Sequence, residues 1–537
     1  MKKNKLKYWL AILFIIIFTF SIVPKTFQND TFYIIELGRG ILKHGVDWQD
    51  HYSIHSHLEY RYPHWAFDVM GALVYNAFGF TGIYVTTQIL ASIFLLIVFW
   101  NMIRKEIHFN LAFLSTLLVA YMMKGSFYAR GQVISFSIFL LEFMILENFA
   151  ERPTFFKSLA LFGLSVIMAN VHSTAWIMML ILVLPFIGEQ VFYWYSLKGI
   201  NERLLKRYQK KYQKLKEKGA SEEKLKIWEE KIQQQKDFKI RNEEQESVTE
   251  HKIIVKKKPN EKYMWVAILV LIMGAFITPL KLTPFFYFIK ISIGNSMSYI
   301  NEHLPVILAG NLELFCYTTI LIALIGFTNT KLKLSDAFLI LGLYLMAISS
   351  RRNVFLLIGL TSGIVVKMID DFIKKNMPTE APKARKVFGV VIGIASVLFS
   401  IYMFIGKIEV PYVSPKLYPV DAAKYIKENL DYQNVRFYNQ YDYGSYLLME
   451  KIPVFLDSRC DLYTPEFNKN VKVFDDYMDV QYGKNSISSL MDQYQLEYAL
   501  VPVTSFERAY MREDKQYTKI YEDKYFVIYQ YEKEESR

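Results

Sequence analysis

Two adjacent arginines, Arg351 and Arg352, stand between two apolar runs of the sequence. A charged arginine at the centre of a membrane-spanning helix costs roughly 2.5–3.5 kcal/mol on insertion scales. Arginine also presents a rigid fork of N–H donors that matches the oxygens of a phosphate. The pair therefore predicts a site for an anionic group, and in a membrane the obvious candidate is a lipid-linked phosphate. The alternative is an ion pair with Glu302 or Asp30 that fixes the helix bundle.

Asp30 is the candidate for proton transfer. It follows the first apolar run, where a carboxylate could accept a proton from a bound hydroxyl or amine. General-base catalysis of this kind contributes roughly 10²–10⁴ in rate. An aspartate directly before Thr31-Phe32-Tyr33 also suits the N-cap of a helix, so both roles stay open.

The polar segment 24–65 is dense in carboxylates and holds several of the nine histidines. We expect Asp50, His51 and His64 in this segment to support the site. His55 and His57, together with Asp50 or His51, have the donor types that zinc or another divalent ion takes. Their spacing matches no established metal motif, and a solvated, hydrogen-bonding loop is the alternative.

Two more candidates lie near the ends of other apolar runs. His172 follows the run 158–171, where it would either support the site or be a simple interfacial residue. Glu302 precedes the run 312–327, and it would pair with an arginine, orient a donor, or cap a helix. The two cysteines, Cys316 in an apolar run and Cys460 in the polar tail, predict no disulfide.

We expect a membrane-embedded bundle of helices to position these residues. The chain has 537 residues, of which 53% are hydrophobic, and many of its apolar runs approach the ~20 residues that span a bilayer. The formal net charge is +12, and the lysines and arginines concentrate in segments that we expect on the cytoplasmic side. The positive charge therefore predicts no nucleic-acid partner. The apolar runs are 8–23, 66–79, 83–103, 110–123, 132–150, 158–171, 174–196, 263–280, 312–327, 336–350, 354–369 and 387–406.

The distribution of lysine and arginine predicts the topology. We expect an uncleaved first span with a cytoplasmic N-terminus, about 11 crossings, and a tail outside the cytoplasm. Because both ends of 8–196 should be cytoplasmic, one of its seven runs does not cross. We take 66–79 as a half-helix on the outer side; the runner-up is 110–123.

The predicted fold class is mostly α: a polytopic transmembrane bundle with a small C-terminal extracytoplasmic α/β domain. It divides into an N-terminal transmembrane module (1–200, with first outer loop 24–65), a charged cytoplasmic helical-hairpin insert (201–262), a second transmembrane module (263–406) and the tail (407–537). In the tail, residue patterns predict helices at 419–429, 467–477 and 487–494, and strands at 435–438, 453–456, 499–503 and 525–529.

Several short motifs together carry a resemblance to a known family. Read along the chain, they are Asp30, Gly38-Arg39-Gly40, Asp50-His51-Tyr52-Ser53, His64-Trp65, Asn170-x-His172, Glu302-His303-x-Pro305, Ser350-Arg351-Arg352-Asn353, Gly444-Ser445-Tyr446-Leu447 and Asp457-Ser458-Arg459 followed by Tyr463. Their order resembles that of bacterial GT-C-type membrane glycosyltransferases, and in particular a large, poorly characterised group among them. The resemblance covers nearly the whole chain except the insert. Two departures stand out: His303 replaces a tryptophan, and Asp30 is followed by Thr31 where some branches have a glutamate.

The resemblance implies an enzyme that uses a sugar carried on a polyprenyl phosphate, at the outer face of a bacterial plasma membrane. Asp30 would activate the acceptor, and Arg351, Arg352 and Arg130 would hold the departing lipid phosphate. A single displacement would invert the anomeric carbon. The acceptor would be an envelope glycan, lipid or protein. Some members use a divalent metal and others do not, so the resemblance leaves the cofactor open.

Two other functions remain open from the sequence. A transporter or flippase of lipid-linked glycans would place polar residues deep along its spans and break its helices there. A non-catalytic envelope assembly protein would leave no open groove at Asp30.

Overall fold

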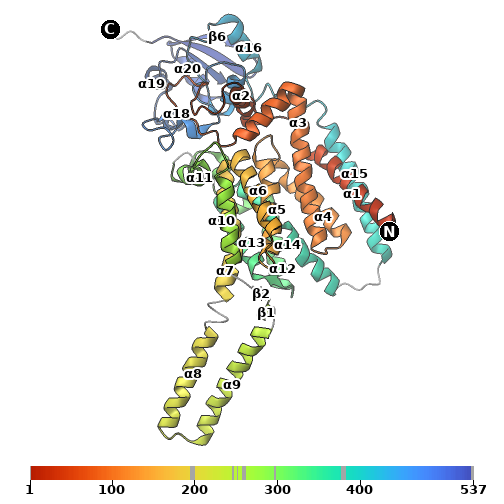
Figure 1. The fold of residues 1–537 in the computed structure, drawn as a ribbon. Helices are drawn as coiled ribbons and strands as arrows, with labels where there is room; N and C mark the ends of the chain where they lie inside the picture. Colours follow the sequence, from red (N-terminus) through yellow and green to blue (C-terminus); the bar gives the residue numbers. More distant parts are fainter. Residues whose placement is uncertain are drawn as a thin grey trace.

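A computed structural model describes residues 2–193, 200–244, 247–250, 252–256, 262–294, 298–376 and 382–533. Figure 1 shows a helical bundle with the C-terminal tail at one end. A long helical hairpin projects from the opposite end of the bundle. The tail and the hairpin, which the sequence assigns to opposite sides of a membrane, therefore lie far apart.

The first half of the bundle follows the apolar runs closely. Its helices are α1 (Lys2–Ile22), α2 (Asn29–His44), α3 (Trp65–Arg104), α4 (Phe109–Met123), α5 (Gln132–Phe149), α6 (Phe155–Val171) and α7 (Ile177–Phe192). A kink at Gly79, whose φ of 61° favours glycine, divides α3 into two helical parts. The part before the kink coincides with the half-helix expected at 66–79.

The second half of the chain adds the hairpin and the remaining bundle helices. The hairpin consists of α8 (Ile200–Glu217) and α9 (Glu222–Glu244), which are joined by a short turn as the sequence pattern predicts. A small sheet of β1 (Ser247–Glu250), β2 (Ile253–Lys256) and β3 (Leu332–Lys333) ties its end to the bundle. The other helices are α10 (Lys262–Ala275), α11 (Thr283–Ile293), α12 (Leu312–Phe327), α13 (Leu334–Ser349), α14 (Asn353–Asn376) and α15 (Pro382–Ile405).

The composition of the bundle helices fits a membrane. Four segments of the described chain are long and apolar enough to cross a bilayer: Lys5–Ile22, Trp65–Arg104, Gln132–Phe149 and Ser173–Phe192. Large apolar side chains such as Leu13, Ile89 and Leu398 are about half exposed on the outside of the bundle. Exposed apolar surface on this scale is unfavourable in water and favourable in lipid. The protein is therefore a membrane protein.

The tail is an α/β domain in which a four-stranded sheet has the order β4-β5-β7-β6. Its strands are β4 (Phe437–Tyr438), β5 (Tyr498–Pro502), β6 (Tyr517–Glu522) and β7 (Phe526–Tyr531). Its helices are α16 (Val420–Asn429), α17 (Gly444–Met449), α18 (Val473–Gln481), α19 (Ile487–Gln493) and α20 (Phe506–Glu513). β4 is parallel to β5, and the other neighbours are antiparallel.

Two tail predictions need correction. The segment 453–456 is no strand of the sheet, because it makes only an isolated bridge between Val454 and Ser53 of the first loop. The helix expected at 467–477 begins later, at Val473. In both cases the segment contacts residues that are distant in the sequence, and a local residue pattern cannot predict such contacts.

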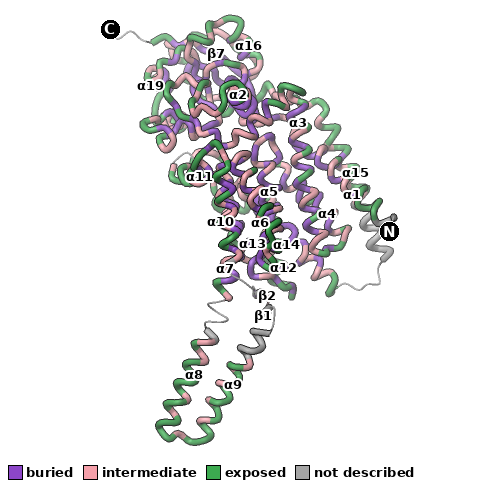
Figure 2. The backbone as a smooth tube through the Cα atoms, in the orientation of Figure 1, coloured by how far each residue is buried: buried purple, intermediate pink, exposed green. Residues whose placement is uncertain are grey.

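Most buried apolar side chains belong to two large cores, and a third, small cluster lies around Val255 and Leu334. One large core lies inside the bundle, and the second joins α2 and the first loop to the tail. Figure 2 shows buried residues in both regions and a largely exposed hairpin. In the second core, the ring of Phe32 lies 4.8 Å from that of Tyr418 and 5.3 Å from that of Tyr446. The first turn of α2 is thus held between the bundle and the tail.

Candidate functional site

A cavity of about 1060 Å³ lies between the bundle and the tail. Asp30, Arg130, Glu302 and Arg351, all singled out from the sequence, line it together. The tail supplies the other wall through Tyr441, Asp442, Ser458, Cys460, Asp461, Phe474, Tyr477, Met478, Gln481 and Tyr482. Residues that are up to several hundred positions apart in the chain thus meet in one space.

Asp30 lies in the first turn of α2, and it does not cap the helix. The N-cap is Gln28, and no side chain makes the capping hydrogen bond, so the N-cap alternative for Asp30 is wrong. Instead, Asp30 Oδ2 accepts a contact of 2.7 Å from Arg130 Nη2. The helix N-terminus adds a favourable field for a negative charge at this position.

Arg130 joins two carboxylates. Its Nη2 contacts Asp30, and its Nη1 donates to Glu302 Oε2 at 3.0 Å. Burial alone would lower the pKa of Arg130, but the charges of Asp30 and Glu302 raise it above its usual value. The guanidinium is therefore a permanent positive charge between two negative ones.

Glu302 lies in a short 3₁₀ helix, η5 (Asn301–His303), which the two residues directly before α14 hold in place. The backbone N–H groups of Arg351 and Arg352 donate to the carbonyls of Leu304 and Glu302, both at 3.1 Å. Glu302 does not cap α12, whose N-cap is Asn311. The expected capping role of Glu302 is therefore wrong.

The charges around Glu302 shift two pKa values. Burial alone would raise the pKa of Glu302, but Arg130, Arg352 and His303 lower it to about 2. Burial and the nearby Arg352 lower the pKa of His303 to about 4, against the opposing charge of Glu302. At neutral pH the segment therefore presents a carboxylate and an uncharged imidazole.

The adjacent arginines have different surroundings. Arg351 lines the cavity and donates from Nη1 to the neutral side chain of Asn301. Arg352 is not part of the cavity lining, and its Nη1 lies 3.5 Å from His303 Nε2. Within the described residues neither arginine forms an ion pair. The alternative of a structural ion pair with Asp30 or Glu302 is therefore wrong for this pair, since Arg130 makes both contacts.

His64 and His172 are not among the residues that line the cavity. His64 Nδ1 is 2.7 Å from Asp68 Oδ1, and its Nε2 is 3.1 Å from the hydroxyl of Tyr33. His172 Nδ1 is 2.7 Å from Ser135 Oγ. Both histidines join neighbouring elements, and their expected role in supporting the site stays a prediction.

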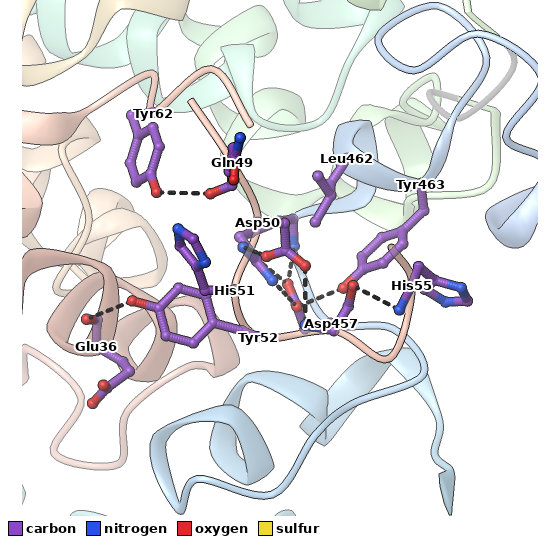
Figure 3. A network of polar contacts seen from close by, with 12 residues as sticks. Glu36, Gln49, Asp50, His51, Tyr52, His55, Tyr62, Asp457, Leu462 and Tyr463 are labelled. Carbon is purple, nitrogen blue, oxygen red and sulfur yellow. Dashed lines mark hydrogen bonds and ion pairs between the residues drawn. The ribbon is translucent and has the colours of Figure 1, made fainter. Parts of the chain in front are cut away.

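Asp50 belongs to a different cluster, at the junction of the first loop and the tail (Figure 3). Its Oδ1 accepts from Arg459 Nη1 at 2.6 Å, while Asp457 accepts two further bonds from the same guanidinium. The side chains of all three are fully buried. Tyr463 donates its hydroxyl to Asp457 at 2.7 Å. Asp50 therefore joins loop to tail, and neither it nor its exposed neighbour His51, which pairs with Asp47, lines the cavity.

The metal hypothesis for His55 and His57 is wrong. His55 Nε2 bonds the carbonyl of Phe455 at 2.7 Å, and its ring packs against aromatic rings of the tail. His57 is exposed and has a positive φ of 64°. In the part of the chain that the structure describes, no group of three His, Cys, Asp or Glu is arranged to hold a metal ion.

The tail wall contains site residues that the sequence did not single out. Asp461 accepts a hydrogen bond from Tyr287 of α11, and burial raises the pKa of its carboxyl. Tyr299, which precedes η5, and Tyr482 of the tail also line the cavity, and their rings lie 5.7 Å apart. The only signal in the sequence was the nearby Asp457-Ser458-Arg459 motif, which marks the segment and not these side chains.

Comparison with known proteins identifies the fold. No protein-family model and no curated protein matches the chain. Among solved structures, it is similar to the oligosaccharyltransferase of Archaeoglobus fulgidus in its apo form, with a TM-score of 0.53 and 10% identity. The match covers 92% of this chain and 70% of that enzyme. The chain has a GT-C-type fold. At this identity the likeness establishes the fold alone, and it confirms the GT-C-like architecture expected from the motifs.

Proposed function

We propose that the chain is a membrane glycosyltransferase that transfers a sugar from a polyprenyl-phosphate donor to a cell-envelope acceptor. The observation that carries this proposal is the shared cavity of Asp30 and Arg351. A free guanidinium and a carboxylate in one hollow are what displacement at a glycosyl phosphate requires. The GT-C-type fold supports the same class of reaction.

Arg351 is the group proposed to bind the leaving phosphate. Its only side-chain partner among the described residues is the neutral Asn301, so a carboxylate does not already neutralise its charge. A preorganised cation acts most strongly where charge develops and water is scarce. Arg352 would contribute at longer range by holding His303, and Arg130 is already engaged by two carboxylates.

Asp30 is proposed as the general base. One of its oxygens is bound to Arg130, and its other oxygen has no hydrogen-bond partner among the described residues. That oxygen would take the proton of the acceptor hydroxyl or amine while the acceptor atom attacks the anomeric carbon. The bond from this carbon to the phosphate oxygen breaks, polyprenyl phosphate departs, and the configuration inverts.

The tail wall is proposed to receive the acceptor. The cavity of about 1060 Å³ is at the upper end of the ~300–1000 Å³ of ordinary ligand sites, which leaves room for a donor head and an acceptor. Its Asp442 and Gln481 offer hydrogen-bond partners for hydroxyl groups. An envelope glycan, lipid or protein is the proposed acceptor.

The proposed orientation places the N-terminus and the hairpin in the cytoplasm of a bacterial cell and the tail outside. The tail and the hairpin extend from opposite ends of the bundle, which supports this arrangement (Figure 1). Lysines and arginines on α8 agree with a cytoplasmic hairpin. The number of about 11 crossings is part of the same proposal.

The two alternative functions have weaker support. An assembly protein would leave no hollow at Asp30, whereas the cavity is open there. A transporter would use polar groups inside the bundle, and Gln88 and Glu142 are indeed buried there. Neither residue lines the cavity that holds the charged groups, so we favour transfer.

The test is a transfer assay in reconstituted membranes with polyprenyl-phosphate sugars and envelope extracts as acceptors. Asp30→Asn should abolish release of polyprenyl phosphate, while Asp47→Asn, a matched change in the exposed part of the first loop, should leave it unchanged. Both variants should reach the membrane in wild-type amounts. Undiminished turnover by Asp30→Asn would remove this residue from the mechanism.

A further inference from the structure

Arg130 forms a bridge between the carboxylates of Asp30 and Glu302. Asp30 comes from the first turn of α2, and Glu302 comes from η5, far along the chain. One guanidinium contacts both carboxylates, at 2.7 and 3.0 Å. Two carboxylates that converge on one point repel each other unless a cation lies between them.

Converging carboxylates are also the ligands that hard divalent cations prefer. A divalent ion in this place would hold the two side chains together and add positive charge beside the reacting phosphate. Arg130 already holds the two side chains together, and its guanidinium contributes one positive charge near the reacting phosphate. Its planar fork suits two separate oxygen acceptors, whereas the single ammonium of a lysine is a point charge.

The surroundings of Arg130 fix it in this position. It follows a turn in which its own N–H donates to the carbonyl of Tyr128 at 2.8 Å. The next residue, Gly131, packs so closely that an added Cβ would lie 2.8 Å from the carbonyl oxygen of Val171. The loop therefore has little freedom to withdraw the guanidinium from the carboxylates.

The third donor that a metal site would need is also occupied. A candidate is His303, whose Nε2 lies 4.0 Å from Glu302 Oε1 and 3.5 Å from Arg352 Nη1. Within the described residues, no group of three metal-binding side chains is present. The carboxylates of Asp30 and Glu302 are thus arranged around the guanidinium of Arg130.

We propose that Arg130 takes the place of a bound divalent cation in this site: it holds Asp30 and Glu302 in register, and sugar transfer proceeds without a metal ion. The statement about transfer rests on the proposed function. The statement about the carboxylates does not, since it concerns only what can bind between them. Arg130 is in this sense a positioning residue for Asp30.

The first experiment uses the wild-type protein in lipid nanodiscs. Direct titration with Mn²⁺ should show no stoichiometric binding, and transfer should continue unchanged in EDTA. If EDTA stops transfer and Mn²⁺ restores it, the proposal is overturned. If no transfer is found under any condition, the proposed function fails, and the Mn²⁺ titration still decides the question about Arg130.

The second experiment removes the bridge. Arg130→Ala should lower transfer about 10²-fold, as removal of one electrostatic contact to a reacting group does. It should also create a Mn²⁺ site seen by titration and by electron paramagnetic resonance, and added Mn²⁺ should restore part of the transfer. The further change Glu302→Gln in this background should abolish Mn²⁺ binding.

Arg39→Ala is the matched control, because Arg39 pairs with Glu36 outside the cavity. It should neither gain Mn²⁺ binding nor lose transfer. If correctly folded Arg130→Ala binds no more Mn²⁺ than this control, the carboxylates do not form the expected cation site and the proposal fails. If Arg130→Ala does not fold, Arg130→Lys provides the test: it should reduce kcat with little change in donor KM, and unchanged kcat would contradict the proposal.

Discussion

Removing the carboxylate of Asp50 should loosen the first loop from the tail without touching the cavity. In Asp50→Ala, Arg459 loses the charge-assisted bond from Nη1, which is 2.6 Å long in a fully buried setting. Bonds to charged groups contribute about 1.5–3 kcal/mol. The backbone N–H of Ser53, which donates to Asp50 Oδ2 at 2.9 Å in the wild type, also loses its acceptor. This loss adds about 1 kcal/mol to the cost of the substitution.

Together these losses amount to about 3 kcal/mol, at the lower end of the ~3–5 kcal/mol for breaking a buried ion pair. The lower end applies because Asp457 still holds Arg459 through two bonds. Since every 1.4 kcal/mol is tenfold, the population of the opened loop should rise about 10²-fold. Burial alone would raise the pKa of Asp50, but Arg459 and Ser53 lower it, so the carboxylate is ionised at neutral pH.

Hydrogen–deuterium exchange of the purified protein in nanodiscs would measure this change. Amides of residues 50–60 should exchange about 10²-fold faster in Asp50→Ala, while those of α5 and α6 should keep the wild-type rate. Asp47→Ala is the control, because its partially exposed pair with His51 should contribute at most about 1 kcal/mol. Equal exchange in wild type and Asp50→Ala would refute the idea that this buried cluster holds the loop to the tail.

Three other outcomes are expected. Arg351→Ala should raise the KM for the lipid donor at least tenfold, whereas Arg352→Ala should change it less, because only Arg351 lines the cavity; equal effects in a transfer assay would contradict this. His303 has its pKa lowered from 6.5 to about 4, so its contribution to stability is complete above pH 6.5 and is lost as pH falls toward 4, by up to about 3 kcal/mol; thermal unfolding of His303→Asn should lack this loss. Gly38→Ala should prevent α2 from packing on α3, since the new Cβ would lie 1.9 Å from the carbonyl oxygen of Asp68; wild-type yield and unfolding temperature would argue against such close packing.

Much of the architecture was readable from local patterns. The apolar runs predict most bundle helices, and the basic residues with helical spacing predict the pair α8 and α9. The separate apolar runs 66–79 and 83–103 predict a break between them, and the kink at Gly79 lies there. That the first run does not cross the membrane stays a prediction. The helix α11 was missed because its 11 residues are too few to span a bilayer, so the stretch 281–311 was expected to be an outer loop.

The sequence predicted several of the residues that line the cavity, but it did not predict which of them form ion pairs with each other. Residue type and position beside apolar runs selected Asp30, Glu302 and Arg351, and the family resemblance added Arg130. Their partners depend on how α2, η5 and α14 pack, which no local pattern contains. The sequence offered an ion pair with Asp30 or Glu302 only as the alternative role of Arg351 and Arg352, whereas the packing pairs both carboxylates with Arg130.

The fully buried guanidinium of Arg459 has a practical consequence for protein engineering. It is shared by the tail and by a loop that is about 400 positions away in the chain. A chimera that exchanges only the C-terminal portion would bring a mismatched set of charges against Asp50. Exchanging tails between related proteins should therefore preserve folding only when the matching stretch after α2 is exchanged as well.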